Sequence, residues 1–383
     1  MPFRQFYSRT IQVGNKKIGP GQPIFLTAEI GAAHQGSAEN VKIMIKAAAE
    51  AGCDGADLFM ATPEGFYWCE ESAKGRNYRN AWRTLSFTDE EWLEFFELAD
   101  SLGIILYPTL LDLESVERCR HLPIKMANIN SDDANDPFLI RAAASLGVPL
   151  TMHDIEITLS ELSQTINVFE ECGFKDLIVL HSTHESGEES TLYRTANLKV
   201  MDTYRQVFGS YGYLTGCVEH TTSDFLIYAV AALEPALISK HIQISKDNPH
   251  DTKISVKIDD LATMVKKVRY VEMALGLGVV ETVVDQNGFR PVPFRRKVLV
   301  AKHDIPAGKV MEMDDFCAKR PGNMGGVASM QYIHLLGATA KQDIPKDTPY
   351  EFSQFDNIQP APYKYPPVKE YRIGTNLDNL HGA

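Results

Sequence analysis

A short apolar run followed by a longer segment of helical periodicity recurs along the first 280 residues of this chain. The apolar runs have the length of buried strands, and the segments between them open near N-cap residues and close on glycine, as helices do. Alternating strands and helices build a parallel sheet covered by helices. The eight runs occupy residues 24–29, 55–60, 104–109, 124–128, 149–153, 177–181, 213–220 and 237–241.

Eight strand–helix units over about 255 residues predict a TIM-type (β/α)8 barrel rather than an open doubly wound sheet. The helical segments carry acidic residues such as Asp89 and Glu161 in their first turns, where the helix dipole stabilises them. The strand assignment of 124–128 is the least supported of the eight, and the alternative is that this run is not a strand.

The periodicity of apolar residues changes near residue 280, where the helical pattern ends. We assign 1–280 to the barrel and 281–293, which contains Gly and Pro, to a linker. In 294–357, short β runs alternate with IPAG, RPGN and IPKD turns, which predicts a small β-rich domain. The Pro- and Tyr-rich segment 358–383 is expected to be an extended tail.

Charge and cysteine content narrow the functional classes. The 383 residues include 38 Lys and Arg against 50 Asp and Glu, a formal net charge of −12, whereas a nucleic-acid partner requires clustered cations. The N-terminus does not have the pattern of a signal peptide and no window approaches ~18 apolar residues, so we expect a cytoplasmic protein without a membrane span. The six cysteines, without CxxC spacing, are expected to be reduced.

Polar residues stand at the ends of the predicted strands. In a TIM barrel the reactive groups lie at the C-terminal strand ends, so we expect these side chains to face one cavity. They are Glu29, Asp57, Thr109, Lys125, His153, His181, His220 and His241.

His220 and His241 end the last two predicted strands, which are neighbours in a closed barrel. Neutral imidazole is the commonest metal ligand, and this pair predicts a site for a divalent cation such as Mn²⁺, Zn²⁺ or Co²⁺. Two histidines at this spacing are a weak signal alone, and buried structural histidines are the alternative.

The other strand-end residues have both functional and structural interpretations. A carboxylate at Glu29 is suited to proton transfer or to orienting sugar hydroxyls. Lys125 is suited to binding an anion or carbonyl, or is a surface lysine. His153, His181 and His184 are candidate acid–base groups or further ligands, or hydrogen-bonded core residues.

Collinear motifs in this chain resemble the sialic acid synthase (NeuB) family over about residues 20–356. The C-terminal part is similar to that family's antifreeze-like SAF domain. The motifs are AEIGAAHQG (28–36), AGCDGADLF (51–59), GIILYPTLLDLESV (103–116), IKMANIN (124–130), VLH (179–181), GCVEHT (216–221), SKHI (239–242), NPHD (248–251) and KRPGN (319–323).

The resemblance implies a metal-dependent condensation. In the family, phosphoenolpyruvate attacks the open-chain aldehyde of an N-acylated hexosamine such as N-acetylmannosamine, giving a nine-carbon 2-keto-3-deoxy acid and phosphate. The metal acts as a Lewis acid. Mn²⁺ is the expected ion here, with Zn²⁺, Co²⁺ and Mg²⁺ as alternatives. The SAF domain caps the barrel of the partner subunit, so a domain-swapped homodimer is implied.

The resemblance also assigns residues. It places the metal on His220 and His241, and together with the strand-end pattern it leads us to expect catalytic roles for Glu29, Lys125 and His181. By the same combination, the positions expected near the substrates are Thr109, Asn128, Asn130, His153, His184, Asp251, Phe294 and Arg320. Arg320, from the SAF part, would reach the acyl group of the sugar in the partner's barrel.

The phosphoenolpyruvate side departs from the family pattern. Asp57 stands where the family has a lysine, Asn130 where it has a catalytic glutamate, and Val218 where it has a serine. Replacing a lysine by an aspartate removes a cation that a trianion needs. Either basic residues of the aromatic loop 61–86, a candidate lid, replace it, or the donor has changed.

Three functions therefore stay open. The first is synthesis of a nonulosonic acid, and the second is a metal-dependent sugar aldolase, lyase or isomerase that does not use phosphoenolpyruvate. The third is a non-catalytic binding paralogue. Because the metal pair and the sugar-side carboxylates remain, we favour an enzyme.

Overall fold

A computed structural model describes residues 9–67, 70, 77–155, 157–183, 193–221, 223, 225–245, 251, 254–276, 297–320 and 326–359. The described residues fall into two compact units, one within 9–276 and one within 297–359.

The first unit is a closed barrel of eight parallel strands. They are β3 (Phe25–Glu29), β4 (Gly55–Met60), β5 (Ile105–Leu110), β6 (Ala127–Ile129), β7 (Leu150–His153), β8 (Leu177–Ser182), β9 (Leu214–Glu219) and β10 (Leu237–Gln243). Each strand pairs with the next, and β10 pairs with both β9 and β3, which closes the barrel. A two-residue strand, β11 (Val256–Lys257), adds to β10 outside the closed ring. The predicted (β/α)8 barrel is confirmed, and its short fourth strand begins at Ala127 rather than at residue 124.

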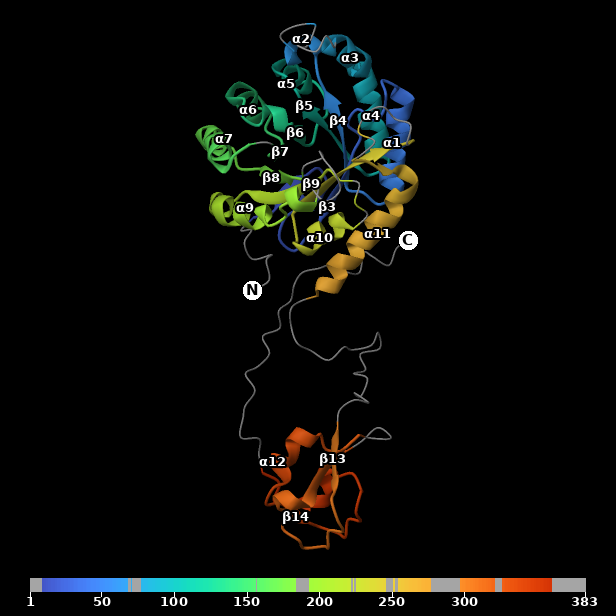
Figure 1. The fold of residues 1–383 in the computed structure, drawn as a ribbon, viewed down its shortest axis with the longest axis vertical. Helices are drawn as coiled ribbons and strands as arrows, with labels where there is room; N and C mark the ends of the chain where they lie inside the picture. The colour runs from blue at the N-terminus through green and yellow to red at the C-terminus, as the bar shows by residue number, and fades with distance from the viewer. Residues whose placement is uncertain are drawn as a thin grey trace. The chain divides into compact units, whose positions relative to one another are not determined.

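Helices surround the strands (Figure 1). They are α1 (Ala38–Glu50), α2 (Pro63–Phe66), α3 (Tyr78–Leu85), α4 (Asp89–Ser101), α5 (Leu113–Cys119), α6 (Pro137–Ala144), α7 (Leu159–Glu171), α9 (Val200–Phe208), α10 (Leu226–Ala232) and α11 (Ile258–Leu275), with 3-10 turns η2 (Ser131–Asp133) and η3 (Gly209–Tyr211). Reciprocal capping boxes, Thr88 with Glu91 and Thr158 with Glu161, begin α4 and α7. In the described residues, no helix is long and apolar enough to cross a membrane.

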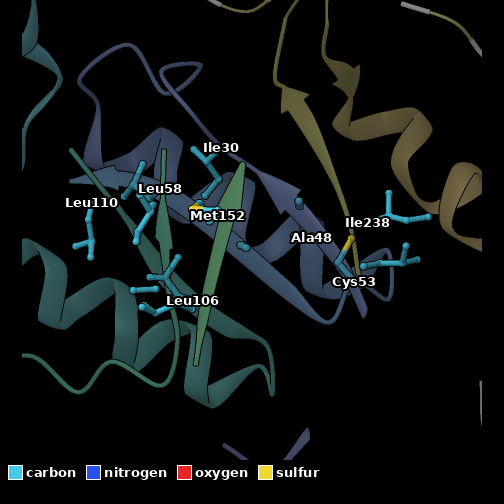
Figure 2. Close-up of a cluster of buried hydrophobic side chains, with 14 of the residues drawn as sticks. Ile30, Ala48, Cys53, Leu58, Leu106, Leu110, Met152 and Ile238 are labelled. Atoms are coloured by element: carbon cyan, nitrogen blue, oxygen red, sulfur yellow. The ribbon is translucent and has the colours of Figure 1, made fainter. Parts of the chain in front are cut away.

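The main hydrophobic core lies between the strands and the helices (Figure 2). Leu58 of β4, Leu106 and Leu110 of β5 and Ile238 of β10 belong to it, and Ala48 of α1 packs in the same cluster. Because side chains alternate along a strand, the residues between these face the barrel lumen.

One end of the lumen is closed by an N-terminal hairpin, β1 (Ile11–Val13) and β2 (Lys16–Ile18). Its apolar side chains form a second buried cluster with residues at the strand starts, including Phe25 and Met126. We call this cluster the apolar end of the lumen. The opposite end, where the strands finish, is the end at which TIM barrels carry their active sites.

The second unit is small and β-rich, as predicted. Its strands are β12 (Val298–Ala301), β13 (Phe316–Lys319), β14 (Thr339–Ala340) and β15 (Phe355–Asp356), with α12 (Tyr332–Leu335) and the 3-10 turns η4 (Met313–Asp315), η5 (Ser329–Gln331) and η6 (Phe352–Gln354). Its own core includes Leu299, Leu335 and Tyr350.

Candidate active site

Five ionisable side chains face the lumen where the strands finish, and we call them the polar end of the lumen. Glu29 and Asp57 stand on β3 and β4, His153 on β7, His241 on β10, and His220 directly follows β9. All five are at most 6% exposed. In the sheet register His241 pairs with Glu29 and Glu29 pairs with Asp57, so closure of the barrel brings these side chains to one level.

Glu29, His220 and His241 form a cluster with the geometry of a metal site. One ligand atom from each lies within 4.8 Å of the others. The Nε2 atom of His241 is 3.1 Å from Oε1 of Glu29, and the two imidazole centroids are 5.1 Å apart. The hydroxyl of Ser239 donates to the other oxygen of Glu29 at 3.1 Å.

This cluster fits a divalent cation. Two imidazoles and a carboxylate are a common ligand set for borderline ions. The Nδ1 atom of His241 is buried without a hydrogen-bond partner among the described residues, so it has a lone pair or proton to satisfy. The Nδ1 atom of His220 lies 3.2 Å from the carbonyl of Thr183. Since that carbonyl only accepts, Nδ1 carries the proton and Nε2 keeps its lone pair for a ligand.

The electrostatics separate the protonation states of these groups. Burial alone would raise the pKa of Glu29, but His241, His220 and His153 outweigh it and lower that pKa far below its usual range. Burial and His241 lower the pKa of His220 to about 3. For His241 burial opposes the charged form, yet Glu29 holds its pKa above the usual value. In this cluster Glu29 is therefore ionised, His220 is neutral, and His241 is the more basic of the two imidazoles.

Asp57 and His153 add two further unsatisfied atoms beside this cluster. Oδ1 of Asp57 and Nε2 of His153 are buried and find no hydrogen-bond partner in the part of the chain that the structure describes. Burial, followed by the repulsion of Glu29, raises the pKa of Asp57 well above its usual value. Burial also lowers the pKa of His153. Both groups are thus suited to hydrogen bonds with a polar ligand.

A chain of neutral hydrogen bonds crosses three strands of the lumen. The amide of Asn128 donates to the hydroxyl of Thr109 at 3.1 Å and accepts from the hydroxyl of Thr151 at 2.7 Å. Asn130 follows β6 on the same face and is half-buried. The structure thus brings the predicted Thr109 and Asn128 together, joined by Thr151, which the strand-end rule did not select.

Asp251 lies next to the metal cluster. Its Oδ2 accepts from the backbone N–H of Ala32 at 3.2 Å. Gly31, with φ of +53°, separates it from His241, and a Cβ on this glycine would lie 3.0 Å from Asp251 and 3.1 Å from the imidazole. Glycine is therefore required at position 31, a role that the strand-then-glycine motif AEIG signals only in hindsight.

The prediction that Lys125 lies at the mouth is wrong. Lys125 precedes β6 by two residues and stands at the apolar end, where its side chain is 3.1 Å from a Cβ built on Gly14 of the hairpin. Its ammonium group pairs with Asp100 at the end of α4. Because Met126 faces the lumen, its neighbour Lys125 faces outward.

The prediction that His181 lines the cavity is also wrong. On β8, Leu180 belongs to the lumen cluster, so His181 faces the helix layer. Its Nδ1 contacts Asp154 at 2.9 Å and its Nε2 contacts the carbonyl of Ala196 at 2.8 Å. Asp154 also accepts from the hydroxyl of Tyr204. Both ring nitrogens are used, so His181 supports the fold.

The structure of the barrel does not test three of the predicted positions. Arg320 follows β13 in the second unit and is exposed. His184 and Phe294 lie outside the described residues. In the loop 61–86, Arg79 and Arg83 contact acidic residues of the same loop, among them Glu70, so these two cations are neutralised locally.

The fold and the ligand set define a class, that of parallel-barrel proteins with a candidate metal site at the strand ends. The sequence profile of the NeuB family matches residues 44–280, and that of the SAF domain matches 296–353. The chain belongs to the NeuB family, as the sequence motifs indicated.

This chain is similar to individual relatives over most of their length. An uncharacterized protein of Methanocaldococcus jannaschii is 27% identical over 338 residues, which covers 88% of this chain and 96% of the relative. Pseudaminic acid synthase of Campylobacter jejuni is 27% identical and covers 87% and 96%. The crystal structure of N-acetylneuraminic acid synthetase from Leptospira borgpetersenii superposes with a TM-score of 0.65 at 23% identity, over 73% of this chain and 95% of that one.

Proposed function

We propose that this chain is a metal-dependent synthase that condenses a three-carbon donor with an N-acylated hexosamine or related sugar. The product is a nonulosonic, sialic-acid-like 2-keto-3-deoxy acid. The observation that carries the proposal is the buried cluster of Glu29, His220 and His241, whose ligand atoms lie within 4.8 Å of one another, in a chain whose relatives include a pseudaminic acid synthase.

His220 and His241 would hold the metal, with Glu29 beside them. Mn²⁺ is the proposed ion, and Zn²⁺, Co²⁺ and Mg²⁺ are the alternatives. When bound, such an ion supplies Lewis-acid activation of a carbonyl oxygen. The hydroxyl of Ser239, 3.1 Å from Glu29, keeps that carboxylate oriented toward the cluster.

The remaining groups of the polar end have roles that follow from their protonation states. Glu29, ionised because three imidazoles surround it, accepts a hydrogen bond or a proton from a sugar hydroxyl. Asp57 and His153 each offer a buried, unsatisfied atom and would bind the polar groups of the substrates. Asp251, next to His241, would bind the sugar. The three-carbon donor would be bound by Thr109, Asn128 and Asn130.

A second candidate is a metal-dependent sugar aldolase, lyase or isomerase that does not use phosphoenolpyruvate. Two observations favour it. Asp57 places a buried carboxyl where the resemblance puts a lysine, and Lys125 pairs with Asp100 at the apolar end instead of reaching the cavity. The phosphoenolpyruvate pocket implied by the resemblance thus loses both of its strand lysines.

We also propose a homodimer in which the second unit of one chain caps the barrel of its partner, with Arg320 and Phe294 binding the acyl side of the sugar.

The cysteines of the described residues are free thiols, namely Cys53, Cys119, Cys172, Cys217 and Cys317. Free thiols are typical of a reducing compartment, and we place the protein in the cytoplasm.

The decisive experiment incubates the purified protein with Mn²⁺, phosphoenolpyruvate and a panel of N-acylated hexosamines. Released phosphate and the 2-keto acid are measured together. Equal amounts of both with one acceptor support the synthase. Metal binding without phosphate release for any acceptor would replace it by the second candidate, and His220→Ala serves as the inactive control.

A further inference from the structure

A buried ion pair lies directly behind the two histidines of the metal cluster. Lys240 precedes His241 on β10, and Glu219 precedes His220 at the end of β9. Lys240 is 4% exposed and Glu219 is fully buried. Since Ser239 and His241 face the lumen, the Lys240 side chain lies on the opposite face of the strand, outside the cavity.

The ammonium group of Lys240 has three acceptors, and all of them belong to the segment that carries His220. It lies 2.5 Å from Oε2 of Glu219, 3.2 Å from the carbonyl of Glu219 and 2.5 Å from the carbonyl of Thr221. The hydroxyl of Thr221 donates to the other oxygen of Glu219. The three protons of Lys240 thus hold the residues on both sides of His220.

His220 needs such a support because it stands beyond the sheet. The parallel pairing of β9 with β10 ends where Glu219 meets Lys240, so no ladder position holds His220 itself. The hydroxyl of Thr183 accepts from its backbone N–H at 2.7 Å on one side. Lys240 holds the chain on the other side, and it is covalently joined to His241.

Stability alone does not explain this arrangement. Two buried charges lose their hydration, and an apolar pair of the same volume usually stabilises a fold equally well or better. Groups that orient metal ligands, in contrast, change metal affinity by about 10- to 100-fold when they are removed.

We propose that Lys240 and Glu219 are positioning residues that hold His220 and His241 at the separation a single metal ion requires. They do so through the backbone of the β9 end and touch neither metal nor substrate. This inference rests on the metal site of the proposed function.

The test measures Mn²⁺ affinity by calorimetry and thermal unfolding on the full chain. Lys240→Met removes the cation and leaves the buried Glu219 carboxylate unpaired, so both stability and affinity should fall. The double variant Lys240→Met/Glu219→Met removes the whole pair. It should regain much of the stability, while its Mn²⁺ Kd stays about 10- to 100-fold above that of the wild type. Glu219→Gln, which keeps the shape of the side chain, should fold and bind Mn²⁺ several-fold more weakly.

Arg269→Met is the matched control, because Arg269 forms a half-buried ion pair with Asp54 at the other end of the barrel, at 2.7 Å. It should lower the melting temperature without changing the Mn²⁺ Kd. If the double variant and Glu219→Gln both bind Mn²⁺ within about twofold of the wild type, the positioning role is refuted while the metal site stands. If the wild type itself binds no Mn²⁺, Zn²⁺ or Co²⁺, the proposed metal site fails and this inference fails with it.

Discussion

The two ends of the barrel lumen are both buried, but they differ in whether their polar groups have hydrogen-bond or ion-pair partners. At the apolar end the hairpin β1–β2 fills the space with aliphatic side chains, and nearby charges such as Arg269 and Asp54 are paired at 2.7 Å. At the polar end, buried atoms without a hydrogen-bond partner among the described residues include Oδ1 of Asp57, Nε2 of His153 and Nδ1 of His241.

Unpaired buried polar atoms cost folding free energy, on the order of 1–3 kcal/mol each. The contrast therefore indicates that the apolar end stabilises the fold and that the polar end is suited to binding a ligand. Substitutions at the two ends should therefore separate stability from binding.

The largest effect is expected from His241→Ala. Removing an imidazole ligand should weaken Mn²⁺ binding about 1000-fold, roughly 4 kcal/mol, because the cation loses a directly coordinating nitrogen. Calorimetric titration measures this, and His121→Ala, which removes an exposed imidazole elsewhere, is the matched control. Full metal content in His241→Ala would mean that the metal site is wrongly placed.

At the apolar end the opposite pattern is expected. Ile18 is fully buried in the hairpin, and Ile18→Ala should lower the free energy of unfolding by about 3 kcal/mol through lost burial and a cavity. The Mn²⁺ Kd should stay within twofold of the wild-type value. Denaturant unfolding and calorimetry on the same sample check both, and a large change in Kd would show that the two ends are coupled.

Metal affinity should also depend on pH through one group. Glu29 raises the pKa of His241, and a metal binds only the neutral ring. Below that raised pKa a proton competes, so Kd should weaken about tenfold, ~1.4 kcal/mol, for each unit of decreasing pH. Above it Kd should level off. His220, with its pKa lowered to about 3, adds no slope near neutral pH.

Calorimetry in buffers of different ionisation enthalpy tests this directly. One proton should be released per ion on the sloping part and none on the plateau. A Kd that stays flat from about pH 5.5 to 8.5 would contradict the His241–Glu29 pairing.

The smallest effect is expected from Asp57→Asn. The pKa of Asp57 is raised in the folded state, so the folded protein binds more protons than the unfolded chain, and stability falls as pH rises above the ordinary aspartate pKa. An amide removes this penalty, and the variant should be more stable by about 1 kcal/mol at neutral pH, with a smaller gain in acid. Denaturant unfolding of the variant and the wild type, measured at neutral pH and again in acid, checks the sign of the change in stability. A loss of stability would reveal a partner for Asp57.

The strand-end rule worked where strand length and parity were read correctly. It selected Glu29, Asp57, His153, His220 and His241, which are all buried. The ligand atoms of Glu29, His220 and His241 lie within 4.8 Å of one another.

Two misplaced residues show why the rest was not predictable. The sequence pattern puts Lys125 at a strand end, whereas β6 begins only at Ala127. It also predicts that His181 faces the lumen, whereas β8 continues to Ser182 with the opposite alternation. Because side chains alternate with a period of two, a shift of one residue moves a side chain from the lumen to the helix layer.

By itself the sequence determined the alternation of strands and helices, the small second domain, and the presence of imidazoles and carboxylates near strand ends. These are properties of neighbouring residues, since burial periodicity and turn chemistry are local. Only the tertiary structure decided that Glu29 joins the two histidines and that Lys240 supports them. The reason is barrel closure, in which β10 pairs with β3 and brings Ser239 within a hydrogen bond of Glu29 across 210 positions of the chain.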